Sequence, residues 1–326
     1  MGVMYLTTAL ALFKYFERYK GFANGLARAG ETTAGIVFPP VLVFLQDLYG
    51  FRGTLLLCGA ISLHATVFCL LLKDPPWMAQ KRSQKYIHKP QTLDANLRKS
   101  ANSLNERRGT STIVQHSDTQ SCARDLLTMF RNPLFYVAIT CNLVVHFSQN
   151  AFLTTIVDFA MDKGSSLAEA SSIISYVSPA DFLGRMLLPL LADRNYIRRS
   201  TLVMVSFCVT AASVMSLPHT ASFATLLPTS VCFVTALGCL LTMEIVIVTD
   251  YVGVPLFALC YGLCSLTTIP GILVSPLVFG IFRDSMGTYD NMYRLIGGIH
   301  LATTLVFGAV LWSERRTGRP HQTTGL

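Results

Sequence analysis

Residues 171–192 read SSIISYVSPADFLGRMLLPLLA, a run that is long and apolar enough to span a lipid bilayer and that nevertheless contains Asp181 and Arg185. An ionised side chain near the bilayer centre costs about 2.5–3.5 kcal/mol, so a chain keeps one only where it faces protein or water. On an α-helix four residues advance by about 400°, which places both side chains on one face, one turn apart. The stretch therefore predicts a polar cavity in which the two groups pair or share a ligand.

The composition of the whole chain is that of a membrane protein. Of its 326 residues 52% are hydrophobic and only 13% are charged, and the mean hydropathy is +0.47, which is typical of a chain that lies in lipid. The sequence has no catalytic triad, metal-ligand cluster or phosphate-binding loop, so we expect a protein that is not an enzyme and has no metal and no cofactor.

Apolar runs of about 20 residues predict eight full membrane spans. They lie at about residues 22–45, 54–72, 133–157, 167–191, 200–217, 222–248, 255–282 and 292–312. The first dozen residues, MGVMYLTTALAL, are apolar but too few to cross a bilayer, so we expect half a helix there. The predicted fold class is all-α, a polytopic bundle of membrane helices.

Basic residues gather in four places, within residues 14–20, 73–131, 194–199 and 315–319. Cytoplasmic loops are rich in Lys and Arg, and an even number of predicted spans separates each cluster from the next. We therefore expect a multi-pass membrane protein whose residues 73–131 and C-terminus are cytoplasmic. The net charge of +8 is explained by this topology and by contact with anionic lipid, with no nucleic-acid partner.

The same patterns divide the chain into four parts. Residues 1–72 are expected to be the end of an N-terminal helix bundle, and residues 132–313 a C-terminal bundle of six helices. Between them, residues 73–131 are polar and have too little apolar content for a core, which predicts a disordered cytoplasmic linker. Residues 314–326 are expected to be a cytoplasmic tail.

Three motifs resemble those of one known family. KYFERYKGFANGLARAGETTAG, residues 14–35, resembles the fifth-helix signature of the monocarboxylate transporter family in the major facilitator superfamily. YGFRGTLLLCGAISLH, from Tyr49, is similar to that family's turn from helix five into helix six, and VFGIFRDSMGTYDNMY, from Val278, to its turn from helix eleven into helix twelve. The resemblance implies the major facilitator superfamily fold. In this register Met1 lies late in helix four, so roughly the first three and a half helices are expected to be missing.

The resemblance also implies a function. The family's members are secondary transporters that move small monocarboxylates such as lactate or pyruvate by alternating access, and the plasma membrane is the expected location. They carry in helix eight an arginine that binds the substrate carboxylate, one turn after an acidic residue that takes part in proton coupling; Arg185 and Asp181 match these positions. The expected coupling ion is therefore a proton, and a single-pass glycoprotein chaperone is an expected partner. A structural ion pair within the helix is the alternative for Asp181 and Arg185.

Other intramembrane polar residues are further candidates. Arg28 and Glu31 depart from the family pattern and lie three residues apart, so they could form a local pair or contact substrate. Glu244 has no basic partner nearby in the sequence and is expected to be protonated or to face a cavity. Three single histidines are expected in hydrogen-bonded packing: His64, His146 and His300.

Two further motifs concern how helices meet and end. Gly21, Gly25 and Ala29 recur every four residues and, together with Gly30, predict that this helix backbone approaches another closely. DRNYIRRS, residues 193–200, follows the span that contains Arg185. Its charges either gate or anchor the cytoplasmic loop, or form an ordinary solvated turn.

Three classes of function remain open from the sequence. The first is a secondary transporter of monocarboxylates, or a fragment of one. The second is a truncated membrane protein that does not transport and instead binds or regulates a full-length partner. The third is a membrane enzyme or receptor, a class of protein in which the fifth-helix motif would have no reason to occur.

Overall fold

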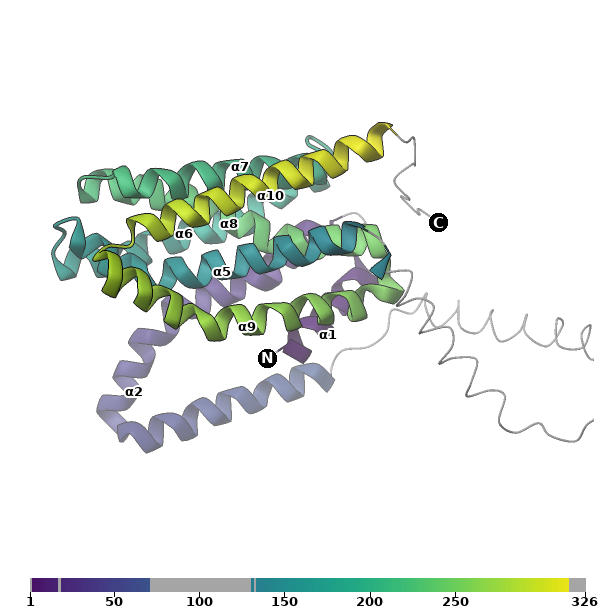
Figure 1. Cartoon of the computed structure of the whole chain (residues 1–326). Helices are drawn as coiled ribbons and strands as arrows, with labels where there is room; N and C mark the ends of the chain where they lie inside the picture. The colour runs from purple at the N-terminus through teal and green to yellow at the C-terminus, as the bar shows by residue number, and fades with distance from the viewer. Residues whose placement is uncertain (1, 17–18, 71–129, 132, 317–326) are drawn as a thin grey trace, which may run out of the picture. The chain divides into compact units, whose positions relative to one another are not determined.

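The computed structural model describes residues 2–16, 19–70, 130–131 and 133–316, which are almost entirely helical and contain no β-strand. Most of the predicted linker, residues 73–131, and most of the predicted tail, residues 314–326, lie outside these ranges. The helices are α1 (Gly2–Tyr15), α2 (Lys20–Leu70), α5 (Pro133–Asp162), α6 (Leu167–Asp193), α7 (Arg199–Ser216), the short 3₁₀ helix η1 (Leu217–His219), α8 (Phe223–Val252), α9 (Val254–Met286) and α10 (Asp290–Arg316), as Figure 1 shows.

The helices follow the apolar runs closely. Each of the six spans predicted after residue 132 corresponds to one helix, and the two spans predicted before residue 72 both fall in α2. Gly50 separates those two spans with a φ of 65° and a ψ of 177°. This left-handed φ is one that glycine adopts at little cost, which explains why the break falls at this residue.

The chain falls into two compact units, residues 1–54 with 132–326, and residues 55–131. In the first unit α8 packs against α6 and α7, α7 packs against α10, and α5 packs against α9. The most apolar 18-residue stretch of α8 is 78% buried within the protein. A polar side chain in this stretch of α8, such as the buried Thr242, therefore lies inside the bundle and away from lipid.

The outer surface of the helices is apolar. Large side chains such as Leu273 and Leu305 are 74% and 67% exposed, as expected for groups that face lipid. By length and composition five stretches of the described chain could cross a membrane: Pro40–Phe68, Arg199–His219, Phe223–Val252, Leu256–Met286 and Asp290–Trp312. The chain is thus an all-helical bundle with membrane-like helices, as the sequence predicted. Three of the eight predicted spans, at 22–45, 133–157 and 167–191, are not among these five stretches, although each of them lies in a helix.

Candidate functional site

The Asp181 and Arg185 pair predicted from the sequence lies inside the first unit. Arg185 Nε donates to Asp181 Oδ2 at 2.8 Å, and the Arg185 side chain is only 2% exposed. A Cβ at position 238 on α8 would lie 2.7 Å from Asp181 Oδ1 and 3.2 Å from Arg185 Cγ. Gly238 therefore leaves the space on α8 into which this pair fits.

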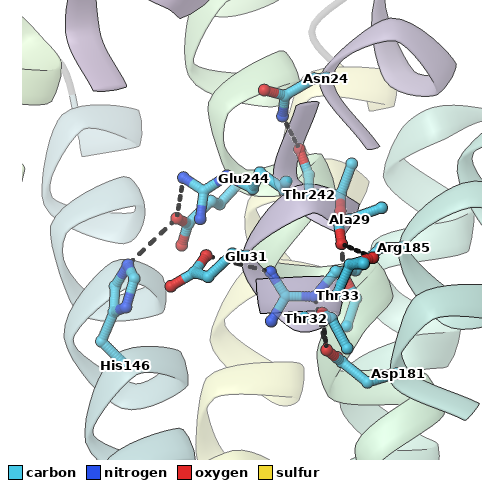
Figure 2. A network of polar contacts seen from close by, with 12 residues as sticks. Asn24, Ala29, Glu31, Thr32, Thr33, His146, Asp181, Arg185, Thr242 and Glu244 are labelled. Atoms are coloured by element: carbon cyan, nitrogen blue, oxygen red, sulfur yellow. Dashed lines mark hydrogen bonds and ion pairs between the residues drawn. The ribbon is translucent and has the colours of Figure 1, made fainter. Parts of the chain in front are cut away.

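Helix α2 brings two more polar side chains to the pair. Thr32 Oγ1 donates to Asp181 Oδ2 at 2.5 Å, and Arg185 Nη1 lies 3.5 Å from Glu31 Oε2. Figure 2 shows Glu31 and Thr32 on one turn of α2, facing Arg185 and Asp181 on α6. The Glu31 side chain is 48% exposed, in contrast to that of Arg185. One buried guanidinium is thus held between a carboxylate of its own helix and an exposed carboxylate of another.

A second group of charges lies around Glu244 on α8. Arg28 Nη2 is 3.6 Å from Glu244 Oε1 and donates to the Tyr261 hydroxyl at 3.1 Å. On the α5 side His146 Nε2 lies 3.2 Å from Glu244 Oε1, and Asn142 Nδ2 donates to Oε2 at 3.4 Å. Glu244, which the sequence left without a partner, therefore has polar neighbours from α2, α5 and, through Arg28, α9.

The two groups form one charged cluster, defined here as Arg28, Glu31, Asp181, Arg185 and Glu244. It contains two guanidiniums and three carboxylates, with His146 at its edge. Charges this deep in a membrane protein are expected to line a substrate or ion pathway. Throughout the described part of the chain no group of three or more His, Cys, Asp or Glu side chains could hold a metal ion.

The small residues of α2 were expected to allow close packing, and the structure places them individually. A Cβ at Gly25 would overlap the backbone carbonyl of Arg185, and one at Gly21 would lie 3.0 Å from Asp193 Oδ2. Ala29 is buried, whereas a Cβ at Gly30 would meet nothing within 4 Å. Helix α2 thus approaches α6 closely at Gly21 and Gly25 and not at Gly30.

The DRNYIRRS motif joins the ends of four helices. Asp193, at the end of α6, accepts from the Phe22 amide at the start of α2 at 2.8 Å and from Arg199 at 2.9 Å. Arg199 also lies 2.7 Å from Asp250 near the end of α8, and Lys20 lies 3.5 Å from the same carboxylate. A carboxylate at a helix N-terminus satisfies free N–H groups and complements the helix dipole.

We expect Asp193→Asn to destabilise the protein by about 2 kcal/mol, because it removes the charge from a fully buried acceptor of two hydrogen bonds. The measurement is thermal unfolding of the purified protein in detergent. Asp47→Asn is the matched control, since Asp47 is exposed. Equal midpoints for the two variants would show that the motif is only a solvated turn.

Several residues of the site were not predicted as functional. His146 was expected in packing; it lies against the Glu244 carboxylate, whereas His64 contacts the Ala60 carbonyl and His300 contacts Ser148. Asn142, Thr32 and Tyr261 were not singled out at all. A usable signal existed for α5, because Asn142 and His146 are polar residues four apart, on one face of the predicted span.

Comparisons with known proteins agree with this architecture. Residues 1–255 match the sequence profile described as Major Facilitator Superfamily, so the chain belongs to that superfamily of membrane transporters. Monocarboxylate transporter 2 from Homo sapiens is 23% identical over 295 residues, which are 90% of this chain and 59% of that protein. Monocarboxylate transporter 12 from Rattus norvegicus is 25% identical over 309 residues, covering 93% of this chain and 62% of the relative. The predicted resemblance to monocarboxylate transporters is confirmed.

The solved structures support the fold. The crystal structure of the Major Facilitator Superfamily transporter FucP in the outward conformation matches 93% of this chain and 72% of its own, with a TM-score of 0.65 and 15% identity. The chain spans less than two thirds of the length of the curated relatives named above. It is a multi-pass membrane protein of a superfamily whose members are transporters and not enzymes.

Proposed function

We propose that the chain is part of a secondary transporter of the plasma membrane that moves small monocarboxylates such as lactate or pyruvate together with a proton. The observation that carries the proposal is the Arg185 guanidinium, which is 2% exposed and held between Asp181 and Glu31. A buried guanidinium in a superfamily of transporters is the natural partner of an anionic substrate, because its planar fork of donors fits a carboxylate.

Glu31 occupies the place that a substrate carboxylate would take. Its oxygen lies 3.5 Å from Arg185 Nη1, which is longer than a good charge-assisted hydrogen bond, and its side chain is 48% exposed. A small anion from solution can therefore displace Glu31 at modest cost. The second oxygen of the anion would take up the remaining donors of the guanidinium.

Asp181 affects the coupling of substrate to proton through Arg185, because it holds the guanidinium that would bind the substrate. It accepts from Arg185 Nε at 2.8 Å and from Thr32 at 2.5 Å. These bonds fix the direction of the arginine within the bundle, so the strength with which Asp181 binds Arg185 sets how available the guanidinium is to substrate. The two halves of a complete transporter would rock about this site. A single-pass glycoprotein could assist the folding of the complete transporter.

Glu31→Gln is expected to tighten the binding of pyruvate about 1.4- to fivefold. The change removes a competing carboxylate whose partly exposed ion pair is worth about 0.2–1 kcal/mol. Pyruvate affinity would be measured by calorimetric titration of the purified protein in detergent. Glu31→Asp is the matched control: it keeps the charge, and its affinity should stay near that of the unaltered protein. Weaker binding to Glu31→Gln would mean that Glu31 does not compete with substrate.

A further inference from the structure

We propose that Glu244 and His146 form the proton-binding pair of this site and that a cavity beside them is the route by which the proton arrives. The inference rests on the proposed function, since it names the groups that take up the proton when an organic anion binds. It also assigns the coupled proton to Glu244 and His146 and not to Asp181, which the sequence favoured for proton coupling.

The geometry of the pair suits one shared proton. His146 Nε2 lies 3.2 Å from Glu244 Oε1, a distance that a single proton can bridge as a hydrogen bond in either direction. The His146 side chain is 26% exposed and that of Glu244 is 7% exposed. An imidazole nitrogen can either donate or accept a hydrogen bond, and histidine is the side chain that proteins most often use to carry a proton.

Asp181 is less suited to that task. Both donors that reach its Oδ2, the Arg185 guanidinium and the Thr32 hydroxyl, bind the ionised form of the carboxylate. Protonating Asp181 would weaken the contact with a guanidinium that is itself only 2% exposed. Hydrogen bonds donated to the charged form favour that form.

A cavity of about 50 Å³ adjoins Glu244 and Asn142. Its lining on α8 runs from Leu240 past Glu244 to Val252, and its walls include Phe135 near the start of α5 and Val203 near the start of α7. Val203 is one turn from Arg199. The cavity therefore leads from Glu244 toward the end of the bundle that carries Lys20 and Arg199, which the positive-inside rule assigns to the cytoplasm.

One residue that lines this cavity has a buried polar atom without a hydrogen-bond partner in the described part of the chain. Asn142 Oδ1 has no hydrogen-bond partner among the described residues, although the residue is only 4% exposed. The cavity volume is enough for at least one water molecule, because about 10–15 Å³ of space for its centre holds one. Such a water also needs two or more polar partners. A water there can bond both Asn142 Oδ1 and the Glu244 carboxylate and so pass a proton to the pair.

The charges of the cluster explain why anion and proton would bind together. Its two arginines and three carboxylates sum to one negative charge when His146 is neutral. A proton on the pair neutralises the cluster, and an anion at Arg185 restores the negative charge. Each ligand therefore raises the affinity for the other, and this linkage is reciprocal.

Every element around Glu244 contributes to its setting. The ionisable groups facing it are Arg28 from α2, Cys141 and His146 from α5, and Tyr261 and Cys264 from α9. Arg28 Nη2 lies 3.6 Å from the Glu244 carboxylate and carries the permanent positive charge in this group. The two cysteines and the tyrosine are neutral in their ordinary forms near pH 7 and add no charge to it.

The test is calorimetric titration of the purified chain with sodium pyruvate near neutral pH in two buffers of different ionisation enthalpy, which gives the number of protons taken up per anion. The unaltered protein should take up close to one proton. His146→Gln should reduce this number to near zero, and Glu244→Gln should do the same. His64→Gln is the matched control and should behave as the unaltered protein, because His64 contacts only a backbone carbonyl.

The possible outcomes are distinct. Proton uptake that persists in Asp181→Asn but is lost in His146→Gln supports the pair. Uptake that persists in His146→Gln, or that Asp181→Asn alone abolishes, overturns it. Glu244→Gln could fail to fold, because it removes the buried ion-pair partner of Arg28. The result for His146→Gln still tests the proposal in that case. A wild-type chain that binds no pyruvate contradicts the proposed function itself, and the inference falls with it.

Discussion

Arg185→Lys is expected to weaken the binding of lactate and pyruvate by roughly 30- to 160-fold, which corresponds to about 2–3 kcal/mol for a charge-assisted, two-pronged contact. Lysine keeps the positive charge but loses the planar fork. It also loses the Nε donor that binds Asp181 at 2.8 Å, so the remaining ammonium would be drawn to Asp181 and away from substrate. Affinity would be measured by direct binding of labelled lactate to the purified protein.

The control for this variant is Arg294→Lys. Arg294 is exposed and contacts Asn291 on its own helix, so its replacement should leave lactate binding within about a factor of two. Equal affinities for Arg185→Lys and Arg294→Lys would show that the guanidinium of Arg185 does not bind the anion and that the Asp181 pair is structural.

Gly25→Ala is expected to destabilise the protein by about 1–3 kcal/mol, because the added methyl group would overlap the backbone carbonyl of Arg185. The backbone cannot move aside as a flexible side chain can, so α2 and α6 would have to separate. That separation would also pull Glu31 and Thr32 away from Arg185 and Asp181. We would therefore expect a lower midpoint of thermal unfolding together with weaker pyruvate binding.

Gly30→Ala is the matched control on the same helix. A Cβ at Gly30 meets nothing within 4 Å, so the change should be neutral or stabilise the helix by up to about 1 kcal/mol. If Gly25→Ala and Gly30→Ala unfolded at the same temperature, the close approach of α2 to α6 would be wrong.

The spans and the first site pair could be predicted because their signals are local. A helix needs about 20 apolar residues to span a bilayer, and a run of that length can be recognised from one stretch of sequence alone. Asp181 and Arg185 are four residues apart, so helix geometry alone brings them together. The same reasoning predicted that Arg28 and Glu31, three residues apart, could pair locally, but in the structure Arg28 pairs with Glu244 and Glu31 with Arg185.

The partners across helices could not be predicted in this way. Glu31 meets Arg185 although 154 positions separate them, and Arg28 meets Glu244 on a helix near the other end of the chain. Such contacts depend on how α2 is set against α6 and α8, which a periodicity in one helix does not specify. For His146 the four-residue spacing from Asn142 marks a polar face on α5, but the sequence does not specify that this face meets Glu244 on α8.

The measurement that tests the central claim most directly compares lactate with lactamide, its uncharged analogue of nearly the same shape, in titrations of the purified chain and of Arg185→Met. If Arg185 recognises a carboxylate, lactate should bind the unaltered protein at least about 30-fold more tightly than lactamide, and this preference should vanish in Arg185→Met. Equal binding of the two compounds, or a preference for lactate that survives in Arg185→Met, would contradict the account.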